Sequence, residues 1–173
     1  MSDYRRLYLP GGTYFFTVVT HGRQPLFSDE QNIEKLRSAF RYVKTRWPFK
    51  VIAAVVLPDH LHCLWQLPVA DTDFSTRWQM IKTDFSRHVP ARLNKDGSKN
   101  LWQPRYWEHC SIRDDEDFGR HLDYIHYNPV KHGLASASLE WKFSSFRRFV
   151  RTGWYDAAWG GSEPENIRGM EFE

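Results

Sequence analysis

Four side chains in two short segments have the types and spacings needed for chemistry on a phosphate. His60 and His62 are two residues apart in a β-prone stretch, so both rings point to one face of a strand. Two imidazoles that converge in this way can bind one divalent cation. Cys63 points to the other face, into the core, and is therefore a poor ligand candidate. A His-x-His pair is more often structural, so a second segment must complete the site.

The segment 121–128 provides that second group of side chains. Tyr124 and Asn128 are four residues apart and share a helix face. A tyrosine phenol, with a pKa of about 10, attacks a phosphate only with help from a cation or a base. An asparagine carbonyl is a neutral oxygen ligand that suits Mg²⁺ or Mn²⁺. His121, one turn before Tyr124, is a candidate for proton transfer, but a structural role or a DNA contact is the favoured explanation.

The elements that must position these side chains follow from the hydrophobic periodicity. Strands are predicted at 14–20, 49–57, 61–67 and 106–112, and helices at 28–47, 73–88 and 114–128, the last ended by Pro129. This order is the split β-α-β pattern, which predicts an α+β, ferredoxin-like fold: an antiparallel sheet with helices on one face. Without repeats or linkers, residues 1–154 form one domain, followed by a tail at 155–173.

Composition excludes several classes of protein. Hydrophobic residues make up 41% and charged residues 26% of the 173 residues, as in ordinary globular proteins. The longest apolar run is far too short to cross a membrane, and the N-terminus lacks the apolar stretch of a signal peptide. Two cysteines do not indicate a disulfide framework. The sequence therefore predicts a cytoplasmic protein with no membrane partner.

The distribution of charge is more informative than its total. The formal net charge is +3, but residues 155–173 contain five acids and one arginine, a net charge of −4 that leaves +7 for residues 1–154. A basic body is typical of proteins that bind a polyanion, and an aromatic content of 16% offers surfaces for base stacking.

Several ordered motifs together resemble one family. They are YRRLYLPGGTYFFTV at 4–18, PDHLHCLW at 58–65, WQPRYWEH at 102–109, DYIHYNPVKHG at 123–133 and W-x-FSSF at 141–146. The combination resembles the REP-associated tyrosine transposases. These are domesticated relatives of the single-tyrosine HUH transposases, whose insertion sequences move as single-stranded DNA. The resemblance runs from about Tyr4 to Gly160.

The resemblance implies a role for each matching residue. The family's paired histidines fall on His60 and His62, its nucleophile on Tyr124, and its third metal ligand on Asn128. Mobile relatives usually have Gln at this last position, so Asn128 follows the REP-associated branch. The family cleaves single-stranded DNA near a REP hairpin, through a covalent 5′-phosphotyrosine and a free 3′-OH, and can rejoin strands by the reverse attack. Its cofactor is Mg²⁺ or Mn²⁺, and the branch is expected to act as a monomer, whereas mobile relatives are dimers.

Candidate DNA contacts follow from charge alone. Each is a basic residue that can follow the phosphates, with a solvated surface charge as the alternative. They are Arg5, Arg6, Lys82, Arg105, Lys131, Arg147 and Arg148. The N-terminal segment is the expected place for the contact with the tetranucleotide beside the hairpin. The acidic tail is expected to lie over the basic cleft and compete with DNA.

Two alternative functions stay open at this point. A zinc hydrolase can use His-x-His, but it needs further His or Asp ligands, which are scarce nearby in the sequence. A non-catalytic module that binds the REP hairpin is a plausible fate for a domesticated transposase, and its binding would survive replacement of Tyr124. For the catalytic alternative, ligation requires neutral histidines, so activity should fall below about pH 6.

Overall fold

A computed structural model describes residues 10–91, 93–104 and 107–172, and its strands and helices follow the predicted order. The strands are β1 (Thr13–Val19), β2 (Lys50–Val56), β3 (His60–Gln66) and β4 (Trp107–Ser111). The helices are α1 (Glu30–Arg46), α2 (Phe74–His88), α3 (Asp115–Lys131) and α4 (Phe146–Arg151). Four short 3₁₀ turns complete the regular structure of the described residues: η1 (His21–Arg23), η2 (Leu26–Ser28), η3 (Ser138–Glu140) and η4 (Glu165–Ile167).

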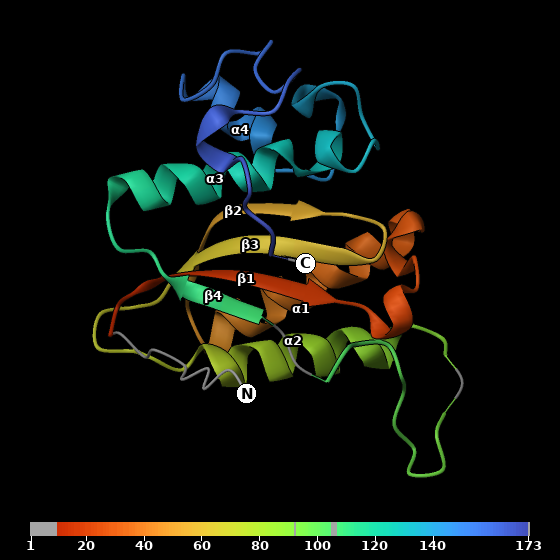
Figure 1. Cartoon of the computed structure of the whole chain (residues 1–173). Coiled ribbons are helices and arrows are strands. Elements are labelled where there is room, and N and C mark those ends of the chain that lie inside the picture. The colour runs from red at the N-terminus through yellow and green to blue at the C-terminus, as the bar shows by residue number, and fades with distance from the viewer. Residues whose placement is uncertain (1–9, 92, 105–106, 173) are drawn as a thin grey trace.

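The sheet has the strand order β2-β3-β1-β4, and every described pair of neighbouring strands is antiparallel. With α1 between β1 and β2 and α2 between β3 and β4, this is the ferredoxin-like α+β topology that the sequence predicts (Figure 1). β3 is an inner strand, paired with β1 on one side and β2 on the other. The histidines therefore lie on the most constrained part of the sheet.

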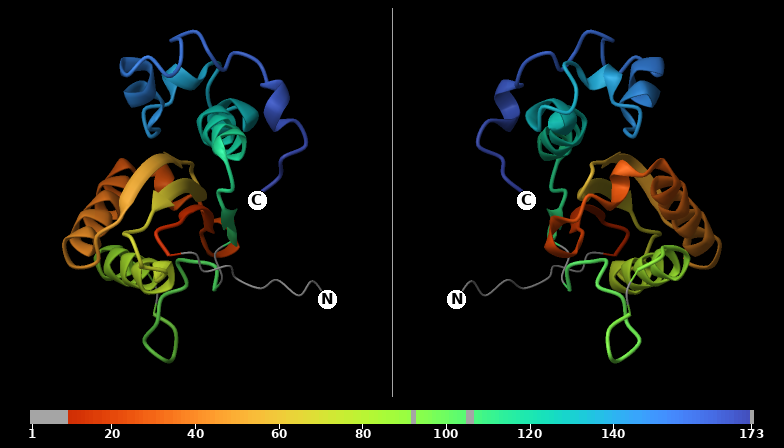
Figure 2. Two further views of the ribbon diagram at one scale, coloured as in Figure 1. Left: turned by 90° about the vertical axis from the view of Figure 1, so that its left-hand side faces the viewer. Right: turned by 90° about the vertical axis from the view of Figure 1, so that its right-hand side faces the viewer.

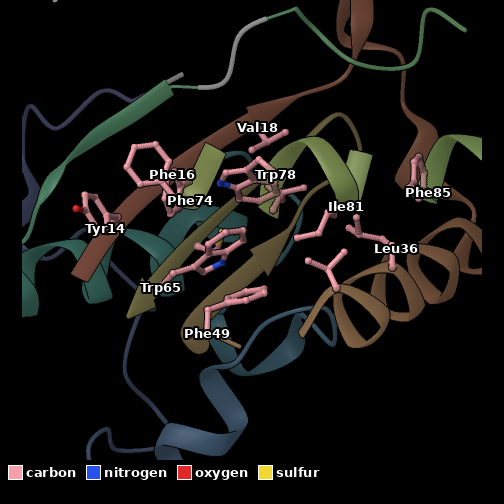
Figure 3. Close-up of a cluster of buried hydrophobic side chains, with 14 of the residues drawn as sticks. Tyr14, Phe16, Val18, Leu36, Phe49, Trp65, Phe74, Trp78, Ile81 and Phe85 are labelled. Atoms are coloured by element: carbon pink, nitrogen blue, oxygen red, sulfur yellow. The ribbon is translucent and has the colours of Figure 1, made fainter. Parts of the chain in front are cut away.

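One face of the sheet is a continuous aromatic core against α1 and α2. Trp65 from β3 stacks on Trp78 from α2, with ring centroids 4.3 Å apart, and Phe49 lies 4.2 Å from Trp65 (Figure 3). Leu36 of α1 and Phe16 of β1 belong to the same cluster. Full burial of side chains of this size is the main stabilising contribution to a domain of this length.

The third helix, α3, lies on the opposite face of the sheet from α1 and α2 (Figures 1 and 2). The prediction that the helices lie on one face is therefore wrong for α3. Its Leu122 and Ile125 belong to one buried cluster with Phe15 and Val55 of the sheet. The physical reason is the alternation of side chains along the strands, which leaves a second partly apolar face that must also be covered.

α3 begins as predicted and ends later than predicted. The Asp114 carboxylate accepts a hydrogen bond from the Asp117 amide, 2.8 Å, and caps the N-terminus. Pro129 was expected to stop the helix, but α3 continues to Lys131. A proline in the last turn removes only one backbone hydrogen bond, and the helix then closes through the His132 amide and the Asn128 carbonyl, 3.1 Å apart.

The C-terminal part of the chain covers both α3 and the outer edge of β2. The Val56 amide donates to the Phe143 carbonyl at 2.9 Å, and the Ser145 amide to the Ala54 carbonyl at 2.8 Å, so the segment 143–145 occupies the β2 edge. Beyond α4 the chain passes α3 and ends beside the sheet (Figure 1). Among the described residues, no helix is long and apolar enough to cross a membrane.

Candidate active site

His60 and His62 open β3 on the face that α3 covers. His62 pairs with Thr17 of β1 and Val55 of β2, and His60 pairs with Val19. The two rings are nearly perpendicular, with centroids 4.9 Å apart. The predicted strand periodicity therefore does bring both imidazoles to one place.

Each histidine is held through its Nδ1 atom. His60 Nδ1 donates to the Asp59 carboxylate at 2.6 Å, and His62 Nδ1 lies 2.9 Å from the Thr17 hydroxyl oxygen. Burial raises the pKa of Asp59, but its bonds to His60 and Arg23 outweigh that effect and hold the pKa below its ordinary value. A neutral imidazole with Nδ1 protonated presents the lone pair of Nε2, so Nε2 is the atom that each ring can offer to a metal.

α3 places three further side chains along the histidine pair. The Tyr124 ring lies 5.3 Å from the His62 ring, and the His132 ring lies 5.3 Å from the His60 ring. Asn128 lies four residues after Tyr124 and four before His132, which places it on the same face of α3 as Tyr124. His60, His62, Tyr124 and Asn128 are at most 2% exposed. The structure thus brings His60, His62 and Tyr124 into contact, with Asn128 buried on the same helix face.

The phenol oxygen of Tyr124 accepts hydrogen bonds from two donors. The Lys131 ammonium donates to it from 3.3 Å, and the backbone amide of Phe172 donates from the same distance. The Lys131 Nζ atom also lies 5.0 Å from the centroid of the Tyr124 ring. One donor comes from the same helix and the other from the C-terminal tail.

The tail lies on the site through Phe172 and is anchored further back on α3. The Phe172 ring is 5.1 Å from the Tyr124 and Phe15 rings, and it stacks on His121 at 5.3 Å. The Asp123 carboxylate accepts hydrogen bonds from the side-chain amide of Asn166 at 2.6 Å and from the Tyr155 hydroxyl at 2.5 Å. Burial and this carboxylate raise the pKa of Tyr155, which keeps its hydroxyl protonated as a donor.

His121 is packed between β1 and the tail. Its Nδ1 atom lies 2.8 Å from the Asp117 carbonyl, and its ring is 4.9 Å from Phe15. Burial lowers the pKa of His121 below its ordinary value, so the ring is neutral at physiological pH. The predicted role in proton transfer stays a prediction.

The donor set at the site fits a hard divalent cation held by two imidazoles and one amide oxygen. Among the residues that the structure describes, no group of three or more His, Cys, Asp or Glu side chains is arranged to bind a metal ion. Asn128 would add a neutral amide oxygen to the two imidazoles, and an amide oxygen is a ligand type that suits Mg²⁺ or Mn²⁺.

Comparison with known proteins places this geometry in a family. The family model described as "Transposase IS200 like" matches residues 10–128. A REP-associated tyrosine transposase of Escherichia coli (strain K12) is 47% identical over 161 residues, 93% of this chain and 92% of its own length. The chain belongs to the REP-associated tyrosine transposases.

Further relatives agree with this family. A Haemophilus influenzae protein (strain ATCC 51907 / DSM 11121 / KW20 / Rd) is 42% identical over 176 residues, 98% of this chain and 99% of its own. A solved structure of a REP-associated tyrosine transposase bound to a REP hairpin has a TM-score of 0.81 and 44% identity, covering 96% of each chain. The likeness thus extends through the whole described fold, including the parts after residue 128 that the family model leaves out.

The predicted DNA-binding residues of this transposase fall in different places. Lys131 contacts Tyr124, whereas Lys82 lies on α2, on the far side of the sheet, and donates to the Gln103 carbonyl at 3.3 Å. Burial lowers the pKa of Lys82 to about 8. Arg147 donates to the Leu139 carbonyl at 3.2 Å, and Arg148 to the Ile52 carbonyl. Arg5, Arg6 and Arg105, with the N-terminal segment expected to contact the tetranucleotide, lie outside the described residues.

Four further residues contact the site and were not predicted from the sequence. Asp59 and Thr17 orient the two histidines, His132 lies against His60, and Phe172 covers Tyr124. Asp59 could have been found from its position directly before His60. Thr17 and Phe172 have no local signal, because only strand pairing and the path of the tail bring them to the site.

Proposed function

We propose that this transposase cleaves and rejoins single-stranded DNA beside a REP hairpin, through a covalent 5′-phosphotyrosine on Tyr124. The observation that carries the proposal is the contact of the Tyr124 ring with buried His62, which itself contacts His60, with Asn128 on the same helix face as Tyr124. The solved relative bound to a REP hairpin supports the choice of DNA.

Each residue of the site has a role in the proposed reaction. His60 Nε2, His62 Nε2 and the Asn128 amide oxygen would hold the cation, with Asp59 and Thr17 fixing the two rings. When bound there, Mg²⁺ or Mn²⁺ would supply positive charge to polarise the scissile phosphate and to offset the charge of the leaving 3′-oxygen. Tyr124 attacks the phosphorus in line, and the resulting phosphotyrosine conserves the energy of the broken bond, so that a second 3′-OH can reverse the step.

A labelled hairpin substrate tests the proposal. Single-stranded DNA with a REP-type hairpin is incubated with the protein and Mg²⁺ or Mn²⁺, then separated on a denaturing gel. Because the protein joins the 5′-phosphate, a 3′-end label should migrate with the protein, while a 5′-end label should leave as a free fragment. The adduct should disappear in Tyr124→Phe and His60→Ala and persist in the matched control Tyr127→Phe, which changes another tyrosine of α3.

The same assay distinguishes the non-catalytic alternative. A module that only binds the hairpin would give no adduct with the native protein under either metal, and its affinity for DNA would survive Tyr124→Phe. An adduct that carries the 5′-end label instead would refute the proposed direction of attack.

We also propose that the tail at 155–173 restrains the reaction. The Phe172 amide donates to the Tyr124 oxygen, and the Phe172 ring covers the phenol, so the tail occupies space that an incoming phosphate needs. Phe172→Ala should therefore raise the rate of adduct formation by about three- to tenfold. Phe149→Ala, which removes a ring elsewhere in the same cluster, is the control for general loosening. An unchanged rate in Phe172→Ala would contradict this role of the tail.

A monomer is the proposed working form. β2 is an edge strand, and residues 143–145 already occupy its backbone donors and acceptors, which removes one surface on which a second copy could add a strand. Light scattering coupled to gel filtration, with and without hairpin DNA, should give the mass of one chain. A dimer that is stable at the concentrations of the cleavage assay would contradict the proposal.

A further inference from the structure

Lys131 is linked to the nucleophile across two turns of α3. It follows Tyr124 by seven residues, and helix side chains lean towards the N-terminus, so its ammonium group reaches back to the phenol. The Nζ atom lies 3.3 Å from the Tyr124 oxygen and 5.0 Å from the ring centroid. The ammonium group is therefore in contact with the Tyr124 side chain at its oxygen and over the ring.

The position of a reacting phosphate follows from this geometry. In-line attack requires the phosphorus within about 3 to 3.5 Å of the phenol oxygen before the bond forms. An ammonium group that already touches that oxygen is then within hydrogen-bond reach of a non-bridging phosphate oxygen, one P–O bond further away. A phosphate that Tyr124 can attack is therefore also a phosphate that Lys131 can bind.

We propose that Lys131 is a catalytic residue, whose ammonium group holds the Tyr124 oxygen and a non-bridging oxygen of the scissile phosphate together. This assignment rests on the proposed function, and it gives Lys131 a task beyond general attraction of the DNA backbone. The ammonium aligns nucleophile and phosphorus and offsets the negative charge on the phosphoryl oxygens in the transition state.

The chemical step balances without a change in Lys131. The bond from the Tyr124 oxygen to phosphorus forms as the bond from phosphorus to the 3′-oxygen breaks. The phenol proton passes to solvent, and the leaving 3′-oxygen takes up a proton to end as a 3′-OH. Lys131 keeps its protons throughout and acts as a fixed donor, and the same contact serves the reverse attack that rejoins the strands.

The test separates the rate of the chemical step from DNA affinity. With the full chain and saturating hairpin DNA, Lys131→Met should lower the single-turnover rate of adduct formation by about 100- to 1,000-fold, the usual effect of losing one charged donor at a reacting centre. In the Tyr124→Phe background, adding Lys131→Met should weaken DNA binding by less than about tenfold, because one phosphate contact is lost among several. For a residue that only attracts DNA, the substitution would weaken DNA binding and leave the single-turnover rate at saturation unchanged.

Two further variants complete the design. Lys131→Arg restores a cation with a different shape. Its single-turnover rate of adduct formation should be at least about tenfold higher than that of Lys131→Met. Lys142→Met is the matched control: this exposed lysine pairs with Glu30 and is expected to keep the native rate within about twofold. Unchanged thermal unfolding of Lys131→Met shows that the fold is intact.

The outcomes distinguish the two proposals. If the native protein forms the adduct and Lys131→Met forms it at saturation within threefold of the native rate, the role of Lys131 is refuted while the proposed function stands. If the native protein forms no adduct with either metal, the proposed function fails, and the role of Lys131 falls with it.

Discussion

The two faces of the sheet are built from the same strands but serve different ends. On the face towards α1 and α2, β3 contributes Leu61, Cys63 and Trp65 to a core of stacked aromatic rings. On the face towards α3, the alternate residues of the same strand include His60 and His62. One strand therefore stabilises the fold with the side chains on one face and positions the histidines with the side chains on the other face.

The difference between the faces also explains how the site is held. A buried histidine pair costs free energy unless its polar atoms are bonded, and Asp59 and Thr17 provide those bonds. The apolar face provides the rigidity, because the rings packed under β3 fix the backbone from which both imidazoles project. We therefore expect stability and activity to respond to different substitutions.

The largest expected effects come from one substitution on each face. Trp65→Ala should lower the free energy of unfolding by about 3–5 kcal/mol, since it removes the ring that contacts Phe49 and Trp78. His62→Gln should lower adduct formation by about 1,000-fold or more, because the proposed metal ligand is lost. Denaturant titration and the denaturing-gel assay measure the two quantities.

Each variant is the control for the other. Trp65→Ala should keep adduct formation per folded molecule within about threefold, and His62→Gln should cost less stability than Trp65→Ala. If both variants lost stability and activity to the same degree, the division of labour between the faces would be wrong.

A smaller effect is expected at Thr17, which orients a histidine of the proposed metal site. Thr17→Val keeps the shape of the side chain but removes the hydroxyl that bonds His62 Nδ1. Loss of such a bond should raise the Mn²⁺ concentration needed for half-maximal adduct formation by about 10- to 100-fold. Thr45→Val, on the exposed surface of α1, removes a hydroxyl bonded only to the Tyr42 carbonyl and should leave the Mn²⁺ dependence unchanged. Equal behaviour of the two variants would contradict the role of Thr17.

The smallest effect concerns His126, a histidine of α3 that packs against other rings than those of the proposed metal site. His126 is fully buried between Phe146, Phe149 and Tyr155, with Nε2 2.8 Å from the Ser145 hydroxyl. Burial, together with the charge of Arg148, lowers the pKa of His126 from 6.5 to about 3. This histidine stabilises the fold only while it is neutral, so the α3 face also contains a purely structural imidazole.

The sign of the pH effect follows from that shift. Between about pH 6.5 and 3 the unfolded chain binds a proton at His126 that the folded chain does not, so stability falls as the pH decreases through this range. Replacing His126 with Gln should flatten the pH dependence of the unfolding free energy by up to about 1.4 kcal/mol per pH unit. Chemical denaturation at pH 7 and pH 5 measures this slope, and an identical slope in both proteins would show that His126 does not titrate on unfolding.

Much of the fold could be predicted from the sequence because its signals are local. Alternation of side chains placed His60 and His62 on one face of a strand, and helical spacing placed Tyr124 with Asn128. The order of strands and helices then predicted the ferredoxin-like topology, which the structure confirms. The error about the helices arose because periodicity gives the apolar stripe of a helix but not the face of the sheet on which the helix packs.

By itself the sequence determined which residues belong to each element and, through its motifs, the family. Only the tertiary structure decided which distant residues meet: Thr17 with His62 through the pairing of β1 and β3, His132 with His60, and Phe172 with Tyr124. The physical reason is that local propensity acts over a few residues, whereas these contacts depend on how the sheet, α3 and the tail pack together. The role proposed for Lys131 has the same origin, since its charge is evident from the sequence but only the fold of α3 brings that charge to the phenol.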